Sequence, residues 1–281
     1  MSVEITTADV YRRSWSWIGA VLSMELRKIF SYRVDFWLQV VGGFFSQFVV
    51  AYYLWQAIFE HNQAEKIGGY SFPMMVAYYV LAPFVDRIVR ANNAFVISQE
   101  IYEGSLSRYL IYPVNYLGFR FVSTLAHALV GLAQMVVGVG VILLIWGYPP
   151  ELTIGWSGLA MGIASCLVSI FVYYLMASII EMVAFWADNV WSLLVMLQFS
   201  SAFLGGGLIP LEVFPVWVQT SLLFTPFPYL IGYPIQGFMG RLSSEQWAEG
   251  LLIILLWTIP LMFTLRWIWE RGRKTYTGVG I

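Results

Sequence analysis

Cysteine and histidine, which most often bind transition metals or act as nucleophile and base, are rare in this 281-residue chain. Cysteine occurs once, as Cys166, and histidine twice, as His61 and His127. Because a zinc site needs about three or four Cys, His or carboxylate ligands, these counts exclude a Cys/His-rich metal site, and the single Cys excludes a disulfide framework. No His-Glu-x-x-His motif occurs, which excludes a metalloprotease of that type. We interpret His127 as a hydrogen-bonded interior residue, with a buried pH switch as the alternative.

One short motif could supply a nucleophile. Gly155-Trp156-Ser157-Gly158 resembles the Gly-x-Ser-Gly pattern of rhomboid intramembrane proteases, in which a His of a later helix activates the serine. A nucleophilic serine needs such a base within hydrogen-bond reach, and no His follows Ser157 in the sequence. We therefore interpret the motif as small residues at the start of a helix.

The amino-acid composition indicates whether the helices of this chain lie in water or in a membrane. Hydrophobic residues make up 59% of the chain and charged residues 11%, against roughly 25% charged residues in a typical soluble domain. The 15 Lys and Arg are balanced by 16 Asp and Glu, so the chain lacks the basic excess that neutralises phosphates, and nucleic-acid binding is disfavoured. The composition predicts a membrane protein.

Long runs free of Asp, Glu, Lys and Arg mark the membrane segments. A helix needs about 20 mostly apolar residues to cross a bilayer core of about 30 Å. The seven runs of this kind are 36–59, 67–85, 121–150, 152–180, 189–211, 213–240 and 250–265. The sixth run holds four prolines, which interrupt helices, so we expect re-entrant short helices there, within an outer region 209–246. Six transmembrane helices remain, and the expected fold is an all-α polytopic membrane protein.

Positive charges predict the orientation of these helices, because cytoplasmic loops of membrane proteins hold an excess of Lys and Arg. Six crossings place both termini on one side of the membrane. That side holds thirteen of the Lys and Arg residues, whereas the other side holds Lys66 and Arg241. We therefore expect both termini to be cytoplasmic. The turn near Asp188 carries no Lys or Arg, so its side follows from the number of crossings and from its neighbours.

Residues 1–33 are predicted to form an N-terminal helix ahead of a six-helix transmembrane domain at 34–281. Between Thr6 and Ser31 apolar residues recur every three or four positions, with most of the Arg, Lys and Ser residues between them. This spacing is typical of an amphipathic helix, and Thr6 with Asp9 has the spacing of a capping box at its start. We expect the helix to lie along the inner membrane surface, either as a part that moves with the first span or as a plain anchor.

The longest polar stretch between the predicted spans runs from 91 to 118, on the cytoplasmic side. Gly104 can end one helix, Ser105 can cap the next with its hydroxyl, and Pro113 can end that helix. This punctuation predicts a short helix over 106–111 between two turns. A short helix on this face suits docking of a partner, although the residues alone favour an ordinary solvated loop.

The stretch 91–118 resembles the coupling segment of ABC-2-type transporter permeases. Glu100-Ile101-Tyr102-Glu103-Gly104-Ser105-Leu106, followed by Leu110 and Pro113-Val114, matches the family pattern Glu-Ile-x-x-Gly-Thr-Leu with Leu and Pro after it, and Ser105 stands where Thr is commoner. Phe185-Trp186, Phe214-Pro215, Pro226-Phe227 and the tail from Trp269 to Gly280 are similar to one subfamily. By resemblance, the residues that transmit the movement of the ATPases are Glu100, Glu103, Gly104, Ser105, Leu106, Arg108 and Pro113.

This resemblance implies a permease subunit of an ABC exporter in the bacterial cytoplasmic membrane. In such a transporter two permeases, as identical copies or related chains, form the path, and two separate ATPase subunits bind ATP and Mg. This chain is expected to hold no cofactor and to be no enzyme. A P-loop has the pattern Gly-x-x-x-x-Gly-Lys-Ser/Thr, and none of Lys28, Lys66 and Lys274 follows a Gly.

Polar residues within the spans could line the path. Four glutamines lie on predicted spans one, three and five: Gln39, Gln47, Gln134 and Gln198. Such side chains also join helices by hydrogen bonds worth about 0.6 kcal/mol on average, so structural packing is the competing interpretation. Because the spans hold no Asp, Glu, Lys or Arg far from their ends, we expect an amphipathic or hydrophobic substrate rather than a small ion. A stand-alone channel or carrier without an ATPase is the alternative function.

In the family, the outer region after the fifth span forms an external gate. The residues that the resemblance assigns to a gate are Gly205, Gly206, Gly207, Pro215 and Pro226. Glycines also allow close approach of helices, and the many aromatic residues here suit an interface between lipid and water, so simple packing is the competing interpretation.

Overall fold

A computed structural model of the chain describes residues 7–31, 33–91, 95–112, 115–147 and 155–278. Over these residues the structure is helical, apart from one isolated β-bridge between Ile67 and Tyr70. The long helices are α1 (Thr7–Ser31), α2 (Arg33–Asn62), α3 (Phe72–Arg90), α6 (Tyr116–Trp146), α7 (Trp156–Glu181), α8 (Trp191–Leu204) and α11 (Ser244–Thr275). The short ones are α4 (Val96–Tyr102), α5 (Leu106–Leu110), η1 (Met182–Phe185), η2 (Leu211–Val213), α9 (Val216–Leu222), η3 (Phe227–Tyr229) and α10 (Gly232–Phe238). The predicted all-α fold is confirmed.

Four helices of the described chain are long and apolar enough to cross a membrane: Phe72–Arg90, Tyr116–Leu144, Trp156–Phe185 and Ser244–Thr275. They cover the second, third, fourth and sixth predicted spans, and α2, with 30 residues, covers the first. The fifth predicted span, 189–211, differs from expectation. Its helix α8 has 14 residues, which is about 21 Å of helix, because the chain turns at Gly205 and Gly206 takes a positive φ of 86°. The count of six crossings stays a prediction.

The proline-rich run 213–240 forms short helices rather than one long helix, as predicted. Pro215 immediately precedes α9, Pro226 immediately precedes η3, and Pro228 lies in the first turn of η3. Proline fits such positions because the first N–H groups of a helix have no partner within the helix. A dip of these helices into the membrane stays a prediction. Three other predicted features lie outside the described residues: the start of the capping box at Thr6, the helix end at Pro113, and the connection 148–154.

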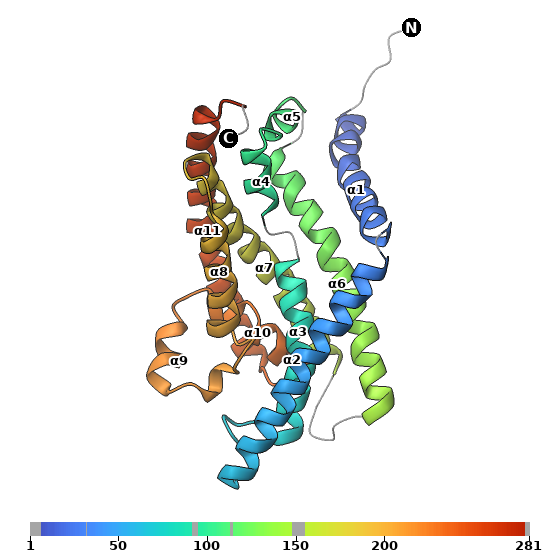
Figure 1. The fold of residues 1–281 in the computed structure, drawn as a ribbon, viewed down its shortest axis with the longest axis vertical. Coiled ribbons are helices and arrows are strands. Elements are labelled where there is room, and N and C mark those ends of the chain that lie inside the picture. The colour runs from blue at the N-terminus through green and yellow to red at the C-terminus, as the bar shows by residue number, and fades with distance from the viewer. Residues whose placement is uncertain (1–6, 32, 92–94, 113–114, 148–154, 279–281) are drawn as a thin grey trace.

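Helix α7 lies at the centre of the bundle and packs against α3, α6, α8, α10 and α11 (Figure 1). Small residues recur along it, and Gly158, Gly162, Ser165 and Ser169 are all buried. The backbone of α10 approaches so closely that a Cβ atom on Gly237 would lie 3.0 Å from the nitrogen of Gly162. Small residues permit this approach, and close packing is what holds helices together where lipid is as apolar as the side chains.

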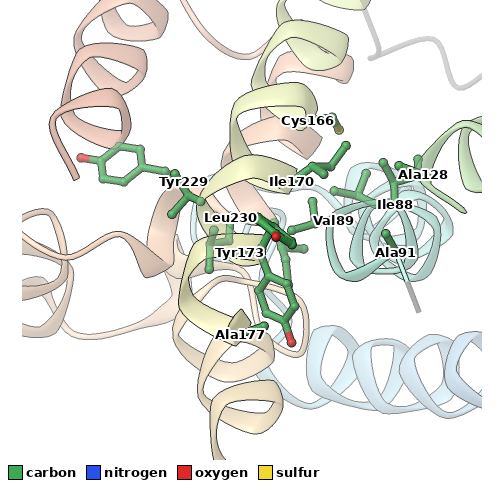
Figure 2. Packing of buried hydrophobic residues seen from close by; sticks show 14 of the residues in the cluster. Ile88, Val89, Ala91, Ala128, Cys166, Ile170, Tyr173, Ala177, Tyr229 and Leu230 are labelled. Carbon is green, nitrogen blue, oxygen red and sulfur yellow. The ribbon is translucent and has the colours of Figure 1, made fainter. Parts of the chain in front are cut away.

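A hydrophobic core joins α3, α6 and α7 to the stretch around η3. Figure 2 shows Ile88 and Val89 of α3 close to Ile170 of α7, with Leu230 beside them. These four side chains are at most 2% exposed. The core therefore fixes the position of α3 and α7, whose ends carry charged residues described below.

Replacing Gly162 by Ala is expected to weaken the packing of α7 against α10. The added Cβ atom would overlap the ring of Phe238, which is buried. Overpacking costs about 1–3 kcal/mol, so the melting temperature of the detergent-solubilised protein should fall in a thermal unfolding experiment. Gly140→Ala on α6 is the matched control, because nothing lies within 4 Å of its added Cβ atom. Equal losses from the two variants would contradict the assigned contact.

Candidate functional site

The described part of the stretch 91–118, the predicted coupling segment, forms one end of the bundle, beside the last turns of α11 and the first turns of α6 (Figure 1). Helix α4 packs against η1 and α7, and α5 follows it after a tight turn. The turn is made by Gly104, whose φ of 72° lies in the left-handed region that favours glycine. The predicted break at Gly104 and the short helix after it are confirmed.

Ser105 does not cap α5 as predicted. Its backbone is already helical, with φ −73° and ψ −15°, whereas a capping side chain needs an extended backbone to reach the free N–H groups. The Ser105 hydroxyl instead lies 3.5 Å from the carbonyl oxygen of Glu100, at the limit of a hydrogen bond. Ser107 takes part in the turn, because its hydroxyl donates to the carbonyl of Gly104 at 2.9 Å.

Glu100 ties α4 to α6 through a buried ion pair. Its carboxylate accepts from the guanidinium of Arg120 and from the hydroxyl of Tyr116, and Glu100 and Arg120 are both buried. The Arg120 guanidinium also lies over the rings of Tyr109, Phe119 and Tyr116, at 5.0, 5.3 and 5.6 Å from their centroids. Such a charge-assisted contact, with aromatic rings around it, orients two helices rigidly.

Glu181 ties the start of α4 to α7. One carboxylate oxygen of Glu181 accepts from the backbone N–H groups of Ile97 and Ser98, at 2.7 and 3.2 Å. The residue before the helix, Phe95, has a φ of 74° and supplies no capping side chain. A carboxylate from a distant part of the chain therefore satisfies the first N–H groups of α4 and complements its dipole.

The predicted coupling residues divide into two groups. Glu100 is buried and Leu106 is fully buried, whereas Glu103 and Arg108 are exposed. Glu103 accepts from the side-chain amide of Gln99 at 2.7 Å, one turn earlier on α4. The inward residues anchor the segment, and the outward ones lie on its exposed side.

The last turns of α11 and the tail after it pack on the stretch 91–118 and on η1. The hydroxyl of Tyr276 lies 3.3 Å from that of Ser107, and the ring of Trp269 stacks on Tyr116 with centroids 5.4 Å apart. Phe185 fills the space beside Gly272, where a Cβ atom would overlap its ring. Tyr102 is the last residue of α4, and its hydroxyl donates to the carbonyl of Ala187 at 3.1 Å. Burial raises the pKa of Tyr102.

A cavity of about 260 Å³ lies beside α4 and is lined by charged residues of several helices. Its charged lining residues are Asp86, Arg87, Arg90, Arg120 and Glu181. Arg90 pairs with Asp86 at 2.8 Å and donates to the carbonyl of Gln198 in α8 at 2.9 Å. Polar side chains from the ends of α3, α6 and α7 and from the middle of α8 therefore meet around the cavity.

Sequence reasoning missed this charged cluster, because its members are far apart in the chain. The spacing of Asp86 and Arg90, four residues apart on one helix, is the one local signal of an ion pair. Arg120 and Glu181 lie near the ends of predicted spans. The residues next to them in the sequence do not predict that both side chains contact α4.

The four predicted path glutamines are not brought together. Gln198 lines the cavity beside α4, whereas Gln134 is buried elsewhere, with both its amide atoms lacking a hydrogen-bond partner among the described residues. Gln47 is half-buried on α2. The side chain of Gln39 lies outside the described residues.

The predicted gate glycines form a tight turn that is bonded to two other helices. Tyr78 of α3 donates to the carbonyl of Gly206 at 2.7 Å, and Tyr79 donates to that of Leu208 at 2.6 Å. The N–H of Gly232 donates to the carbonyl of Gly205 at 2.7 Å. Gly205, Gly206 and Gly207 are all buried, so this turn fixes the end of α8 against α3 and α10, and its role in gating stays a prediction.

The long apolar helices define a class of protein, an all-helical multi-pass membrane protein. Residues 45–280 match the model of the ABC-2 family transporter protein, so the chain belongs to the ABC-2 transporter family. A comparison with curated proteins finds no match. The family is a membrane component of transport, not itself an ATPase, and generally works with ABC ATPase subunits.

Proposed function

We propose that this chain is the permease subunit of an ABC-2 exporter in a bacterial cytoplasmic membrane. Two permeases, identical copies or related chains, form the path, and separate ATPase subunits bind ATP and Mg. The observation that supports this most strongly is the double anchoring of α4. Buried Glu100 links it to α6 and Glu181 of α7 caps its start, so a push on α4 moves two long helices.

The docking surface for the ATPase is the end of α5. Ile111 is 82% exposed and Tyr112 is 64% exposed, next to Leu110, which is also exposed. Adjacent exposed apolar residues, with charged residues such as Arg108 near them, are typical of a protein interaction site. Closure of the ATPase subunits on nucleotide would displace this tip, and the anchors of α4 would carry the displacement to the spans.

In this proposal α2, α3, α6, α7, α8 and α11 are the six crossings, and both termini are cytoplasmic. The Lys and Arg asymmetry of the connections supports this orientation. Helix α1 lies on the inner surface, α9 and α10 dip into the outer side, and Gly205, Gly206, Gly207, Pro215 and Pro226 form the outer gate. Gln198 and the cavity beside it mark the inner part of a path for an amphipathic substrate.

The test is gentle purification of the tagged chain from its native membrane, with mass spectrometry of the associated proteins. We expect an ABC ATPase subunit, together with a related permease if the path is heteromeric. Recovery of the chain alone, under conditions that keep other ABC complexes together, would contradict the proposal and favour a stand-alone channel or carrier.

Ile111→Asp is expected to lower the amount of co-purified ATPase about tenfold. Truncating or charging an apolar residue at the centre of an interface commonly costs more than about 1 kcal/mol. Thr277→Asp, which adds the same charge at an exposed position near the coupling segment, is the control. Equal recovery of ATPase with the two variants would place the docking surface elsewhere.

A further inference from the structure

A second, larger hollow lies between the stretch 211–236 and the first half of α11, away from the coupling segment. Figure 1 shows this stretch, with α9, near the opposite end of α11 from α4 and α5. The hollow is an open groove of about 780 Å³. Sites for single small molecules are typically about 300–1,000 Å³, mostly apolar, with a few polar groups that orient the ligand.

The groove changes from polar to apolar along α11. Gln246 and Glu249 lie in the first two turns of the helix, whereas Leu256, Trp257 and Pro260 lie two to four turns further on. Its floor is close-packed at Gly250, where a Cβ atom would meet the ring of Tyr233. A ligand that fits this gradient has a polar head and an apolar body.

The charge of the groove is negative. Among its described lining residues, Glu212 and Glu249 are carboxylates and there is no Lys or Arg. Glu212 accepts from the side chain of Gln236 with one oxygen, and its other oxygen is buried on the side of Tyr70, whose hydroxyl interacts with the carboxylate. Arg241 lies outside the lining, with its guanidinium 3.7 Å from the centroid of the Tyr70 ring, and its positive charge acts on Glu212. Glu249 is exposed at the edge of the groove.

We propose that this groove binds an amphiphile with a protonated amine head, placing the amine at Glu212 or Glu249 and the apolar body along Leu256 and Trp257. This inference rests on the proposed transport function, because it names the chemical class of the exported substrate. Binding itself needs neither ATP nor an ATPase. An aminophospholipid of the membrane and a separate amphiphilic amine share this chemistry, and the experiment distinguishes them.

The experiment uses the purified full chain in phosphatidylcholine nanodiscs. The probes are a dodecylamine with a photoreactive diazirine in its chain and the matching dodecanoic acid, and the labelled peptides are mapped by mass spectrometry. We expect the amine probe to label peptides from 219–224 and 249–260 more strongly than the acid probe. Unlabelled dodecylamine should displace it.

Glu212→Gln and Glu249→Gln are each expected to lower labelling by the amine probe about threefold to fivefold, because each removes one partly exposed ion pair with the amine. Both changes keep side-chain size, and Glu212→Gln keeps an oxygen acceptor. Glu245→Gln is the matched control, because it is exposed on the same helix and outside the groove. Ile253→Trp, which fills the groove, should lower labelling by both probes.

Equal labelling by the two probes, or labelling that neither Gln variant changes, would overturn the inference. Nanodiscs with added phosphatidylethanolamine separate the two sources: suppression of the amine signal identifies an aminophospholipid, and an unchanged signal identifies a separate amine. Failure of this experiment leaves the co-purification of an ATPase unaffected. The groove assignment and the proposed function can therefore fail independently.

Discussion

Replacing Glu100 by Gln is expected to destabilise the protein by about 3–5 kcal/mol, the effect of removing one partner of a buried ion pair. Glu100 pairs with Arg120, and aromatic rings lie around the guanidinium, so the change leaves a buried positive charge without its partner. Gln fills the same space but carries no charge. We expect a lower melting temperature in detergent and a loss of substrate-stimulated ATP hydrolysis in the assembled transporter.

Glu103→Gln is the control for this prediction, because Glu103 lies one turn away on the exposed side of the same segment. Its effect on stability should stay within about 0.5 kcal/mol, as is usual for exposed positions. The double variant Glu100→Gln and Arg120→Gln should recover part of the loss, because it removes the unpaired charge. Equal melting temperatures for Glu100→Gln and Glu103→Gln would show that the pair does not stabilise the bundle.

The features that the sequence predicted well are those that short-range rules decide. The break at Gly104 follows from the freedom of glycine at positive φ, and the short helices after Pro215 and Pro226 follow from the missing proline N–H. The long spans follow from the run length of apolar residues, and four of them are found in the described chain.

The features that the sequence missed depend on contacts between distant residues. Glu100 and Arg120 are 20 positions apart, and Glu181 is more than 80 positions from the N–H groups that it caps. Apolar periodicity carries no information on which charge meets which helix end. The residue type of Ser105 predicts a cap, but the backbone of Ser105 after the turn at Gly104 is helical and its side chain makes no capping hydrogen bond. The short α8 likewise depends on bonds from Tyr78 and Gly232 to the turn at Gly205 and Gly206.

Glu181 offers the sharper test of how movement is transmitted, because it holds α4 without any contact with the exposed tip at Ile111. Its carboxylate satisfies two buried N–H groups, those of Ile97 and Ser98. Leaving a buried donor without a partner costs about 1–3 kcal/mol, so the loss of both is expected to cost about 2–6 kcal/mol. The loss destabilises the start of α4, because Phe95, the residue before the helix, supplies no capping side chain of its own.

Glu181→Leu is therefore expected to loosen α4, with faster amide hydrogen exchange over residues 97–103 than in the unmodified protein. The ATPase should still co-purify, because Ile111 and Tyr112 are untouched, but its hydrolysis should no longer respond to substrate. Glu181→Gln is the matched variant, since its carbonyl oxygen can still accept from the N–H groups, and it should restore much of the protection. Unchanged exchange in Glu181→Leu would show that the cap does not hold α4. Faster exchange with intact coupling would show instead that movement reaches the spans through Glu100 and α6 alone.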